Sequence, residues 1–424
     1  MKNVLITGFF HPYTRPGGSF RVLPLMKLLP EFGWNPVILT PALLEKKDVP
    51  FRVVGTEYRD IFRFWQRLFG FSEGETFKRQ MQSQIGATSR SKFVEFIFNR
   101  AGEVITYPDP NRGWKKFAVD GGKKILQAEK IDLLFSCHPT ISHIVTRELK
   151  KESGLPWVAD LPDLWSRNHN YRYSSLRRLL DQRTEKKTLG DADVITTVSE
   201  PWAQTLRTIH KGKNVLSIQH GFPPEEFNDP PIPLTDKFTI TYTGSIYPEG
   251  QDLTIFFQAL RQLIDEEKIA PEKIDIRFYG APVAQFEKAF KDFQLMNLAR
   301  QYGPVPRAEA VQRQGESQVL LFAKWKTGNE AGWYSGKIYE YLAARRPILA
   351  VDGRPDVVTE LLKETQAGID ACEYEEVKSS LLKMYREFQG RGAVSYHGRT
   401  DEIQKYSHRE MTGQFVNLFD SILI

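Results

Sequence analysis

The stretch SGKIYEYLAARRPILA, residues 335–350, joins a small-residue turn to a short amphipathic helix, a basic corner and a hydrophobic strand. Ser335 and Gly336 lie where the helix begins, so free backbone N–H groups there can face an anion. Lys337 adds a positive charge at the same end, and Glu340 lies about one turn further along on roughly the same face. The segment therefore places free amides, a cation and a carboxylate within a short length of helix.

These groups permit two interpretations. Amides and a cation suit a diphosphate, and a nearby carboxylate suits a pair of sugar hydroxyls. Alternatively, Lys337 and Glu340 form an ordinary solvated pair at positions i and i+3, which is common on helices. Because the spacing alone favours the solvated pair, the surroundings of the segment must distinguish the two.

Hydrophobic strands alternate with amphipathic helical stretches along the whole chain. In the first half, the expected strands are Asn3–Thr7, Pro36–Leu39, Leu133–Ser136, Trp157–Ala159 and Val194–Val198. In the second half, they are Phe238–Thr243, Asp275–Tyr279, Gln318–Phe322 and Pro347–Val351. This alternation predicts an α/β protein with two Rossmann-like domains, each a parallel sheet covered by helices.

The proline-rich segment GFPPEEFNDPPIP, residues 221–233, predicts the boundary between the two domains. We therefore expect a first domain at 1–222, a second domain at 223–400 and a terminal helix at 401–424. A helical insertion is expected within the first domain, at about residues 51–117.

The expected insertion is unusually basic and aromatic. Residues 51–117 contain twelve Lys and Arg against seven acids, with aromatic residues such as Trp65 and Phe93 between them. The commonest explanation is a helical insertion whose aromatics pack inward while its charges stay solvated. Contact with an anionic membrane surface is the second interpretation. Binding of single-stranded nucleic acid is a weaker third one, and no nucleic-acid partner is expected.

The composition is that of a folded protein with more than one core. Of the 424 residues, 41% are hydrophobic and 12% aromatic. Cys137 and Cys372 lie far apart, which indicates a reducing compartment without a disulfide framework or a zinc site. No apolar run approaches the roughly 20 residues that span a bilayer, and the start MKNVLITGFF is interpreted as a buried strand. We expect a cytoplasmic protein, either free or peripheral at the inner face of the membrane.

Ligands of such sheets bind beyond the carboxyl ends of the strands, where several loops of this chain contain glycine. The candidates are Gly17 and Gly18 after the first strand, Gly244 and Ser245 after Phe238–Thr243, and Gly280 after Asp275–Tyr279. Glycine lets a backbone approach a ligand closely, although paired glycines are also common in tight turns. The first loop lacks a GxGxxG pattern and an acid about 20 residues further on, so a dinucleotide site is not expected.

Six motifs, in order along the chain, resemble the family 4 glycosyltransferases of the two-domain GT-B fold. They are PGG at 16–18, WVADLPDLW at 157–165, DADVITTVS at 191–199, YTGSIY at 242–247, YGPVPRAEA at 302–310 and SGKIYEYLAARRPILA at 335–350. The tail YSHREMTGQFVNLFDSIL, residues 406–423, resembles the terminal helix that crosses back onto the first domain in this fold. The resemblance covers nearly the whole chain and implies two parallel sheets that face each other across a cleft.

The resemblance implies a retaining transferase that moves a sugar from a nucleotide-sugar donor to a hydroxyl of a glycan or lipid-linked acceptor. Family members of this kind assemble bacterial surface polysaccharides. The first domain would hold the acceptor and the second the donor, without a metal or other cofactor. Glu340 would bind the ribose, the backbone at Val305 the base, and Lys337 the diphosphate. The other implied donor-binding residues are Gly17, Gly18, Arg21, Gly244, Ser245, Gly280, Glu330, Ser335 and Gly336.

Two positions depart from the family pattern. Gly332 stands where the family often has a glutamate near the sugar hydroxyls, and Glu330 is the expected substitute. Glu249 stands where a lysine is common after the strand-end glycine of the second domain. Diphosphate binding would then depend more on Lys337 and on one or more of four further cations. These are Arg21, Arg307, Lys324 and Lys326.

The catalytic candidates follow strands of the first domain. His138 ends a strand at a point where the family frequently has a histidine close to the donor sugar, but a structural role is equally open. His11 is a second candidate. Asp160 and Asp163 could orient an acceptor hydroxyl or act as a base, and they could also cap the next helix. A Ser-His-Asp hydrolase is disfavoured because no GxSxG turn is present.

Two other functions stay open from the sequence. Nucleotide-sugar 2-epimerases share the two-domain architecture, and they need a buried acid–base set for proton abstraction. Gly332 makes a non-catalytic nucleotide-sugar binder conceivable.

Overall fold

The computed structural model describes residues 1–9, 21–42, 49–61, 100, 102–169, 171, 173–228, 232–326 and 332–423. It divides the chain into two compact units, which are described separately below. Unit 1 contains Met1–Ile218 and Thr412–Ile424, and unit 2 contains Gln219–Met411. Most of the expected insertion, at residues 62–99 and 101, lies outside the described residues.

Unit 1 is built on a seven-stranded sheet with the order β3-β2-β1-β4-β5-β6-β7, and every neighbouring pair is parallel. The strands are β1 (Lys2–Thr7), β2 (Trp34–Pro41), β3 (Arg52–Thr56), β4 (Leu133–Cys137), β5 (Trp157–Leu161), β6 (Val194–Thr197) and β7 (Asn214–Ser217). The strands β4 and β5 read LLFSC and WVADL, and every residue in them is buried. Continuous burial is typical of a parallel sheet with both faces covered.

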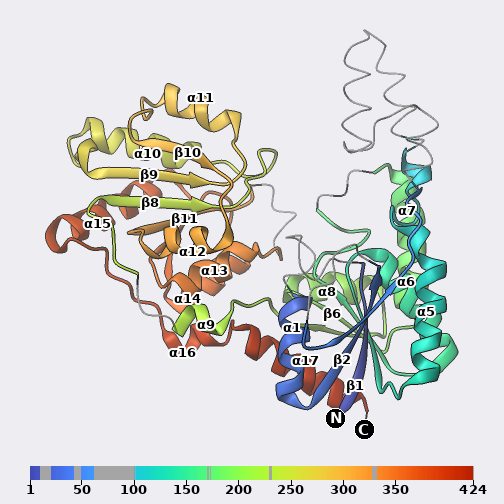
Figure 1. Cartoon of the computed structure of the whole chain (residues 1–424). Helices are drawn as coiled ribbons and strands as arrows, with labels where there is room; N and C mark the ends of the chain where they lie inside the picture. The colour runs from blue at the N-terminus through green and yellow to red at the C-terminus, as the bar shows by residue number, and fades with distance from the viewer. Residues whose placement is uncertain are drawn as a thin grey trace. The chain divides into compact units, whose positions relative to one another are not determined.

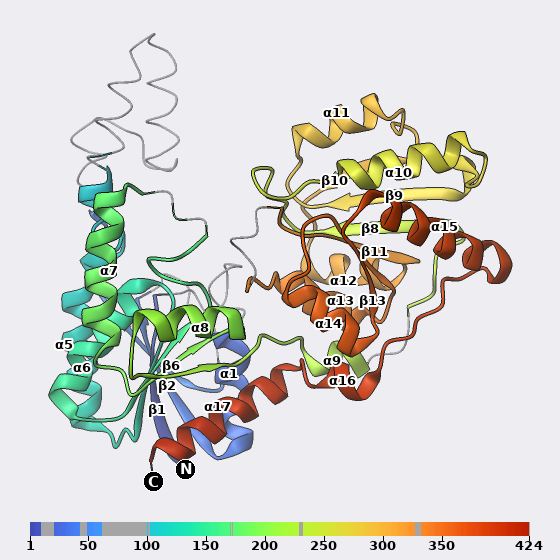
Figure 2. The ribbon, with the colours of Figure 1, turned by 180° about the vertical axis from the view of Figure 1, so that it is seen from behind.

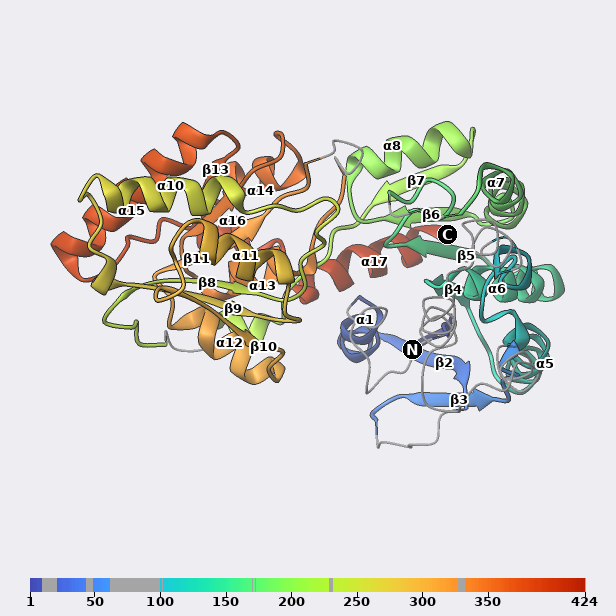
Figure 3. The same ribbon diagram turned by 90° about the horizontal axis from the view of Figure 1, so that it is seen from above.

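Helices cover both faces of this sheet. They are α1 (Val22–Leu28), η1 (Leu29–Phe32), η2 (Arg112–Trp114), α5 (Lys115–Ala128), α6 (Thr140–Ser153), α7 (Ser175–Leu189), α8 (Glu200–Ile209) and α17 (His408–Ile422). Figure 3 shows α5, α6 and α7 in a row on one face, with α1 and α17 on the other. Phe415 and Phe419 of α17 pack against Phe135 of β4, with ring centroids 5.5 and 5.8 Å apart. The end of the chain therefore belongs to the core of unit 1.

A charged pair lies inside this core. Arg21 is 2% exposed and Asp160, in β5, is 0% exposed. Nε and Nη2 of Arg21 lie 2.8 and 3.1 Å from the carboxylate oxygens of Asp160, and Nη2 also donates to the carbonyl oxygen of Ile218 at 2.6 Å. Asp160 accepts a further hydrogen bond from Thr196 at 2.7 Å. Arg21 is thus used by the fold, which corrects the expectation that it offers its charge to a diphosphate. For Asp160, the sequence left an acceptor contact and a helix cap open, and the observed partners include Arg21 and Thr196.

Unit 2 has a six-stranded sheet with the order β10-β9-β8-β11-β12-β13, again parallel throughout. The strands are β8 (Phe238–Thr243), β9 (Ile274–Tyr279), β10 (Ala299–Gly303), β11 (Val319–Ala323), β12 (Ile348–Val351) and β13 (Gly368–Ala371). The helices are α9 (Pro224–Asn228), α10 (Thr254–Asp265), η3 (Pro271–Lys273), α11 (Ala284–Asp292), α12 (Arg307–Gly315), α13 (Gly336–Ala344), α14 (Val357–Thr365), α15 (Tyr374–Arg391) and α16 (Thr400–Gln404). Figures 1 and 2 show α10 and α11 on one face of this sheet and α12 and α13 on the other.

Two hydrophobic layers hold unit 2 together, one on each face of its sheet. On one face, Phe257 and Leu260 of α10 pack with Tyr385 of α15. On the other face, Tyr341 and Leu342 of α13 belong to a second cluster. The apolar side of each helix thus covers a strand surface that is itself continuously hydrophobic, as amphipathic helices on a parallel sheet require.

The structure confirms the α/β class with two parallel sheets. All nine expected strands are present, and the unexpected ones are β3, β7, β10 and β13. These four are the outermost strands of the two sheets. They are less buried than the central strands and so lack a continuous hydrophobic run. In addition, β3 lies within the stretch assigned to the insertion, and the short helix α9 forms within the proline-rich segment.

Replacing Asp160 with Ala should lower the free energy of unfolding of unit 1 by about 3–5 kcal/mol, because Arg21 would keep a buried charge without its partner. Urea unfolding followed by circular dichroism measures the loss. Lys123→Ala is the matched control, since it breaks an exposed pair with Glu152 at 2.8 Å and should leave stability nearly unchanged. Similar small losses in both variants would contradict a structural role for the buried pair.

Candidate functional site

The strand order of unit 2 reverses between β8 and β11, which is where open α/β sheets bind ligands. Gly244 follows β8 and Gly280 follows β9. The N–H of Gly244 donates to the carbonyl oxygen of Tyr279 at 2.7 Å, and the N–H of Gly280 donates to that of Gly303 at 3.0 Å. The backbone turns at the ends of β8, β9 and β10 are therefore tied to one another.

Both glycines adopt backbone conformations that other residues rarely take, with φ of 94° at Gly244 and 154° at Gly280. A Cβ on Gly280 would lie 2.2 Å from the carbonyl oxygen of Gly244. A Cβ on Gly244 would lie 2.9 Å from Cε of Lys337. Glycine is needed here because the backbone and a lysine side chain approach closely at the strand ends.

The side chain of Lys337 extends from the start of α13 to the turn after β8. Its Nζ donates to the hydroxyl of Tyr242 at 2.8 Å and to the carbonyl oxygen of Ser245 at 2.7 Å. The ammonium also lies 4.8 Å from the ring centre of Tyr242. Burial lowers the pKa of Lys337 to about 8, and the attraction of Glu340 offsets part of this effect. Lys337 therefore gives up its proton more readily than an exposed lysine does.

Glu340 is held by side chains of α12. Its Oε1 accepts a hydrogen bond from Nη1 of Arg307 at 2.9 Å, and its Oε2 accepts one from Nε2 of Gln314 at 3.3 Å. Nε2 of Gln314 also donates to Oγ1 of Thr243, the last residue of β8, at 2.8 Å. Lys337 and Glu340 thus have separate partners, so the interpretation of a solvated pair between them is wrong.

Arg307 links Glu340 to a second carboxylate. Its Nη2 donates to Glu226 of α9 at 2.5 Å. Burial opposes the charge of Arg307, but the attraction of Glu340 and Glu226 raises its pKa. Burial also raises the pKa of Glu226, and Arg307 offsets part of that change. The sequence did not suggest Glu226, because it lies in the proline-rich segment, more than a hundred residues before Glu340.

The start of α13 presents its backbone at this point. Ser335 is the N-cap residue, and its side chain forms no cap hydrogen bond with the helix. Gly336, the first residue of the helix, is exposed, whereas Ser335 is buried. Gly332 is buried as well, and Glu330, the expected substitute for the missing acid, lies outside the described residues.

A hollow of about 260 Å³ lies beside Val305, in the loop between β10 and α12. The side chains around it are Arg277, Tyr279, Tyr302, Val305, Glu309 and Arg313. The rings of Tyr279 and Tyr302 stack with their centroids 4.8 Å apart and an interplanar angle of 15°. Tyr302 is exposed and Tyr279 is buried. This aromatic pair was not expected, although a tyrosine near the end of each of two adjacent strands is a signal that could have revealed it.

Two lysines that we considered for a diphosphate are paired with carboxylates. Lys324 follows β11, is 1% exposed, and has its Nζ 2.8 Å from Asp370. Burial opposes the charge of Lys324, but its hydrogen bond to Asp370 raises its pKa. Lys326 pairs with Asp252 at 2.8 Å and with Asp352 at 3.1 Å. Arg307 is likewise paired with two carboxylates, Glu226 and Glu340. Of the described cations that we considered for a diphosphate, Lys337 is therefore the one whose charged group contacts neutral oxygens and no described carboxylate.

In unit 1, the strand order reverses between β1 and β4, and His138 directly follows β4. His138 is exposed, and Asp163 is half-buried in a turn after β5. Asp109, which the sequence did not single out, is 3% exposed and accepts hydrogen bonds from the N–H groups of Asn111 at 2.7 Å and Ile141 at 3.0 Å. Burial raises the pKa of Asp109, and these hydrogen bonds and the attraction of His138 offset part of the change.

Three other expected site residues, His11, Gly17 and Gly18, lie outside the described residues. Among the residues that the structure does describe, no group of three or more His, Cys, Asp and Glu side chains could hold a metal ion. In the same part of the chain, no helix has the length and apolar character to cross a membrane.

Comparison with known proteins identifies the fold. No family model matches the sequence, and no match is found among curated proteins. Sucrose-phosphate synthase from Thermosynechococcus elongatus is similar with a TM-score of 0.65 at 12% identity, over 100% of this chain and 99% of that one. Anabaena HepE in complex with UDP and glucose is similar with a TM-score of 0.61 at 11% identity, over 99% of this chain and 100% of that one. The apo form of the lipopolysaccharide outer core galactosyltransferase WaaB is similar with a TM-score of 0.60 at 12% identity, over 100% of each chain. This likeness confirms the GT-B fold.

Replacing Gly280 with Ala should destabilise unit 2 by about 2 kcal/mol, because the added Cβ meets the backbone of Gly244 in a conformation unfavourable to alanine. Scanning calorimetry measures the change. Gly336→Ala is the matched control, because nothing lies within 4 Å of a Cβ at that helical position. The control should keep or slightly raise the melting temperature. Equal losses in the two variants would contradict the close approach at Gly280.

Proposed function

We propose that this protein is a retaining, metal-independent glycosyltransferase that transfers a sugar from a nucleotide-sugar donor to a hydroxyl of a glycan or lipid-linked acceptor. The arrangement of Lys337 and Glu340 on α13 carries the proposal, because it offers separate contacts for a diphosphate and a ribose. The GT-B fold supports it. Since HepE has this fold and its structures contain UDP or UDP-glucose, a UDP-sugar is the first donor to test.

In this proposal, unit 2 binds the donor at the ends of β8 and β11. The ammonium of Lys337 and the amides at Ser335 and Gly336 would contact the diphosphate, since helix starts favour anions. Glu340 would accept hydrogen bonds from the ribose hydroxyls while Arg307 holds its carboxylate in place. The supporting observation is that these groups lie on one helix, with their side chains fixed by named partners.

The base would lie at the loop that contains Val305. Backbone groups of this loop are the expected hydrogen-bonding partners, and the hollow beside it provides about 260 Å³ of space. Tyr279 and Tyr302, whose rings stack on each other, both line that space. An aromatic lining suits a planar base, because stacking contributes about 1–3 kcal/mol per base in proteins that bind nucleic acids.

During transfer, negative charge develops on the diphosphate as its bond to the sugar breaks. Fixed amides and the ammonium of Lys337 would stabilise that charge without a metal ion, as preorganised donors do in other active sites. Unit 1 would hold the acceptor, with Asp109 next to His138 as a positioning residue. The expected place of action is the cytoplasm, either free or at the inner face of the membrane.

Replacing Glu340 with Ala should weaken binding of the donor by about 1–3 kcal/mol, or roughly 5- to 150-fold, because the ribose loses its acceptor. Isothermal titration calorimetry with the best of the UDP-, GDP-, dTDP- and CMP-sugars measures the effect. Glu360→Ala is the matched control, since Glu360 lies on the exposed side of α14 and pairs with Lys363 at 3.0 Å. An unchanged affinity in Glu340→Ala would overturn the assignment of the ribose contact.

The same donor also tests the reaction class. Release of nucleotide together with a glycosylated product supports transfer. Conversion of the sugar without loss of the nucleotide would instead identify an isomerase. Binding without either reaction would identify a non-catalytic binder.

The affinity for the donor should fall as the pH rises from about 7 to about 9, because the pKa of Lys337 is about 8 in the free protein. The sign follows from the charge: below the pKa the ammonium attracts the diphosphate, and above it the neutral amine does not. The decline should be at most tenfold per pH unit. Lys337→Arg keeps its charge over this range and should give a flat profile. A flat profile in the unaltered protein would show that Lys337 does not contact the diphosphate.

A further inference from the structure

Helix α7 of unit 1 keeps both of its acids inside, whereas four of its five cations, all except the buried Arg177, are exposed. The sequence of this helix, SLRRLLDQRTEKKTL, contains two acids, Asp181 and Glu185, which are 2% and 1% exposed. The opposite side, here called the outer face of α7, consists of Leu176, Leu179, Arg183, Lys186 and Lys187, all of them exposed. Their spacing of i, i+3, i+7, i+10 and i+11 places them in one stripe along the helix.

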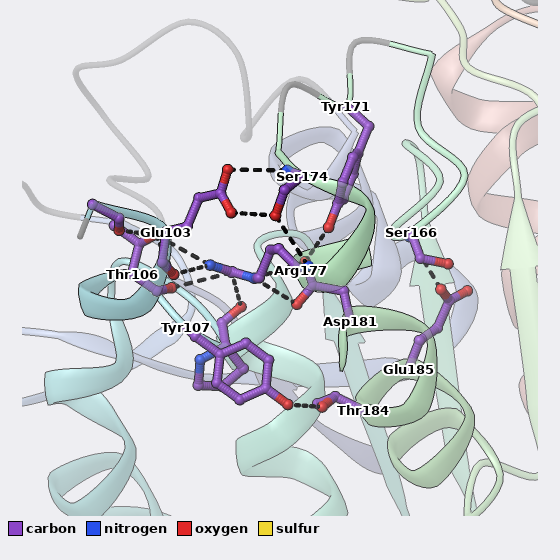
Figure 4. A network of polar contacts seen from close by, with 12 residues as sticks. Glu103, Thr106, Tyr107, Ser166, Tyr171, Ser174, Arg177, Asp181, Thr184 and Glu185 are labelled. Atoms are coloured by element: carbon purple, nitrogen blue, oxygen red, sulfur yellow. Dashed lines mark hydrogen bonds and ion pairs between the residues drawn. The ribbon is translucent and has the colours of Figure 1, made fainter. Parts of the chain in front are cut away.

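A buried polar network holds the two acids inward. Oδ1 and Oδ2 of Asp181 each lie 3.0 Å from Nε of Arg177, and the hydroxyl of Tyr171 donates to Oδ2 at 2.6 Å. Glu185 accepts a hydrogen bond from the N–H of Ser166 at 3.1 Å and lies 3.4 Å from Nε2 of His210. Figure 4 shows Asp181 turned toward Tyr171 and Arg177, and Glu185 turned toward Ser166. The acids are therefore not available to neutralise the cations of the outer face.

Arg177 also fastens a distant segment to the start of α7. Its guanidinium donates to the carbonyl oxygens of Thr106 and Pro108, both at 3.3 Å, and to that of Glu103. The carboxylate of Glu103 in turn accepts from the N–H of Ser174, the N-cap of α7, at 3.0 Å (Figure 4). The segment that contains Val104 is thus held against the first turn of α7.

The apolar side chains near this turn are unusually exposed. Leu176 is 69% exposed and Leu179 is 45% exposed. Val104 and Tyr173 are exposed as well, at 73% and 40%. They rank among the most exposed large hydrophobic residues that the structure describes. The outer face of α7 thus has two leucines toward one end and three cations toward the other, and none of its five residues is an acid.

We propose that the outer face of α7 docks on an anionic lipid surface. Lysine and arginine side chains near such a surface are each attracted by about 1 kcal/mol, and exposed leucines can enter the boundary between headgroups and acyl chains. Long cationic side chains can reach the headgroups while their stems lie along the apolar boundary. Leucines suit lipid better than single-stranded nucleic acid, which is bound by aromatic stacking.

This docking surface is independent of the proposed sugar transfer. It lies on unit 1 and uses none of the residues assigned to the donor in unit 2. The five residues of the outer face also lie outside residues 51–117, where the sequence first suggested contact with a membrane, although the exposed Val104 near them lies within that range. Binding to lipid and binding to a donor can therefore be measured separately, and a substitution in one site can abolish one of them without the other.

The test is co-sedimentation of the full chain with vesicles of phosphatidylcholine alone and of phosphatidylcholine with about a third of phosphatidylglycerol. We expect binding to the anionic vesicles that weakens as salt is added. Arg183→Gln/Lys187→Gln should reduce the partition coefficient by about fivefold per charge removed. Leu176→Ser/Leu179→Ser should also reduce it, without a change in net charge. Circular dichroism of each variant checks that the fold is retained, as expected for exposed positions.

Lys383→Gln/Arg386→Gln is the matched control, because it removes the same charge from exposed positions on α15 of unit 2. Retained binding in this control, with loss in both α7 variants, supports the proposal. Equal loss in the control and the arginine–lysine variant would show an effect of net charge alone and overturn it. Equal binding to neutral vesicles, or unchanged binding of both α7 variants, would also overturn it. Self-association of the unaltered protein that Leu176→Ser/Leu179→Ser abolishes would overturn the proposal too, because a second copy of the chain would then cover the outer face of α7.

Discussion

In both units, the strand order reverses beside the first strand, between β1 and β4 and between β8 and β11. The chain segments that follow the two adjacent strands at such a reversal run to opposite faces of the sheet. The carboxyl ends of these two strands are therefore not covered by a crossover helix. Because both faces of a parallel sheet are buried under helices, polar groups reach solvent mainly at these ends. Gly244 and the side chain of Lys337 lie at this point in unit 2, and His138 lies at the corresponding point in unit 1.

Paired charges inside each unit explain why a count of cations in the sequence overestimates the cations available for a ligand. Arg21, Arg177 and Lys324 are each less than 5% exposed, and each faces an aspartate. Removing such a cation from water is costly, and the partner offsets the cost only when the geometry is close. Lys337 differs, because its Nζ is hydrogen-bonded to a neutral hydroxyl and a carbonyl oxygen. Among the described residues, no carboxylate is in direct contact with this ammonium, so its charge is available to an anion.

The sequence predicted the central strands well because burial on both faces demands continuous hydrophobic runs. It missed β3, β7, β10 and β13 because an edge strand has one unpaired side and does not need such a run. The helix start at Ser335 was also predictable, since small residues precede a clear amphipathic pattern. The partners of Glu340 were not, because Arg307 and Gln314 come from another helix and only tertiary packing brings them near.

The same packing bears on what Glu340 can do. A carboxylate offers about four lone-pair directions, and the protein uses one on each oxygen, through Arg307 and Gln314. Two acceptor directions are left, which is the number that a vicinal pair of hydroxyls requires. Gln314 is anchored to Thr243 at the end of β8, so the orientation of the carboxylate is set by the sheet rather than by α13 alone. A glutamate held in this way loses little further freedom when a diol binds, whereas one on a solvated helix face would have to be ordered first.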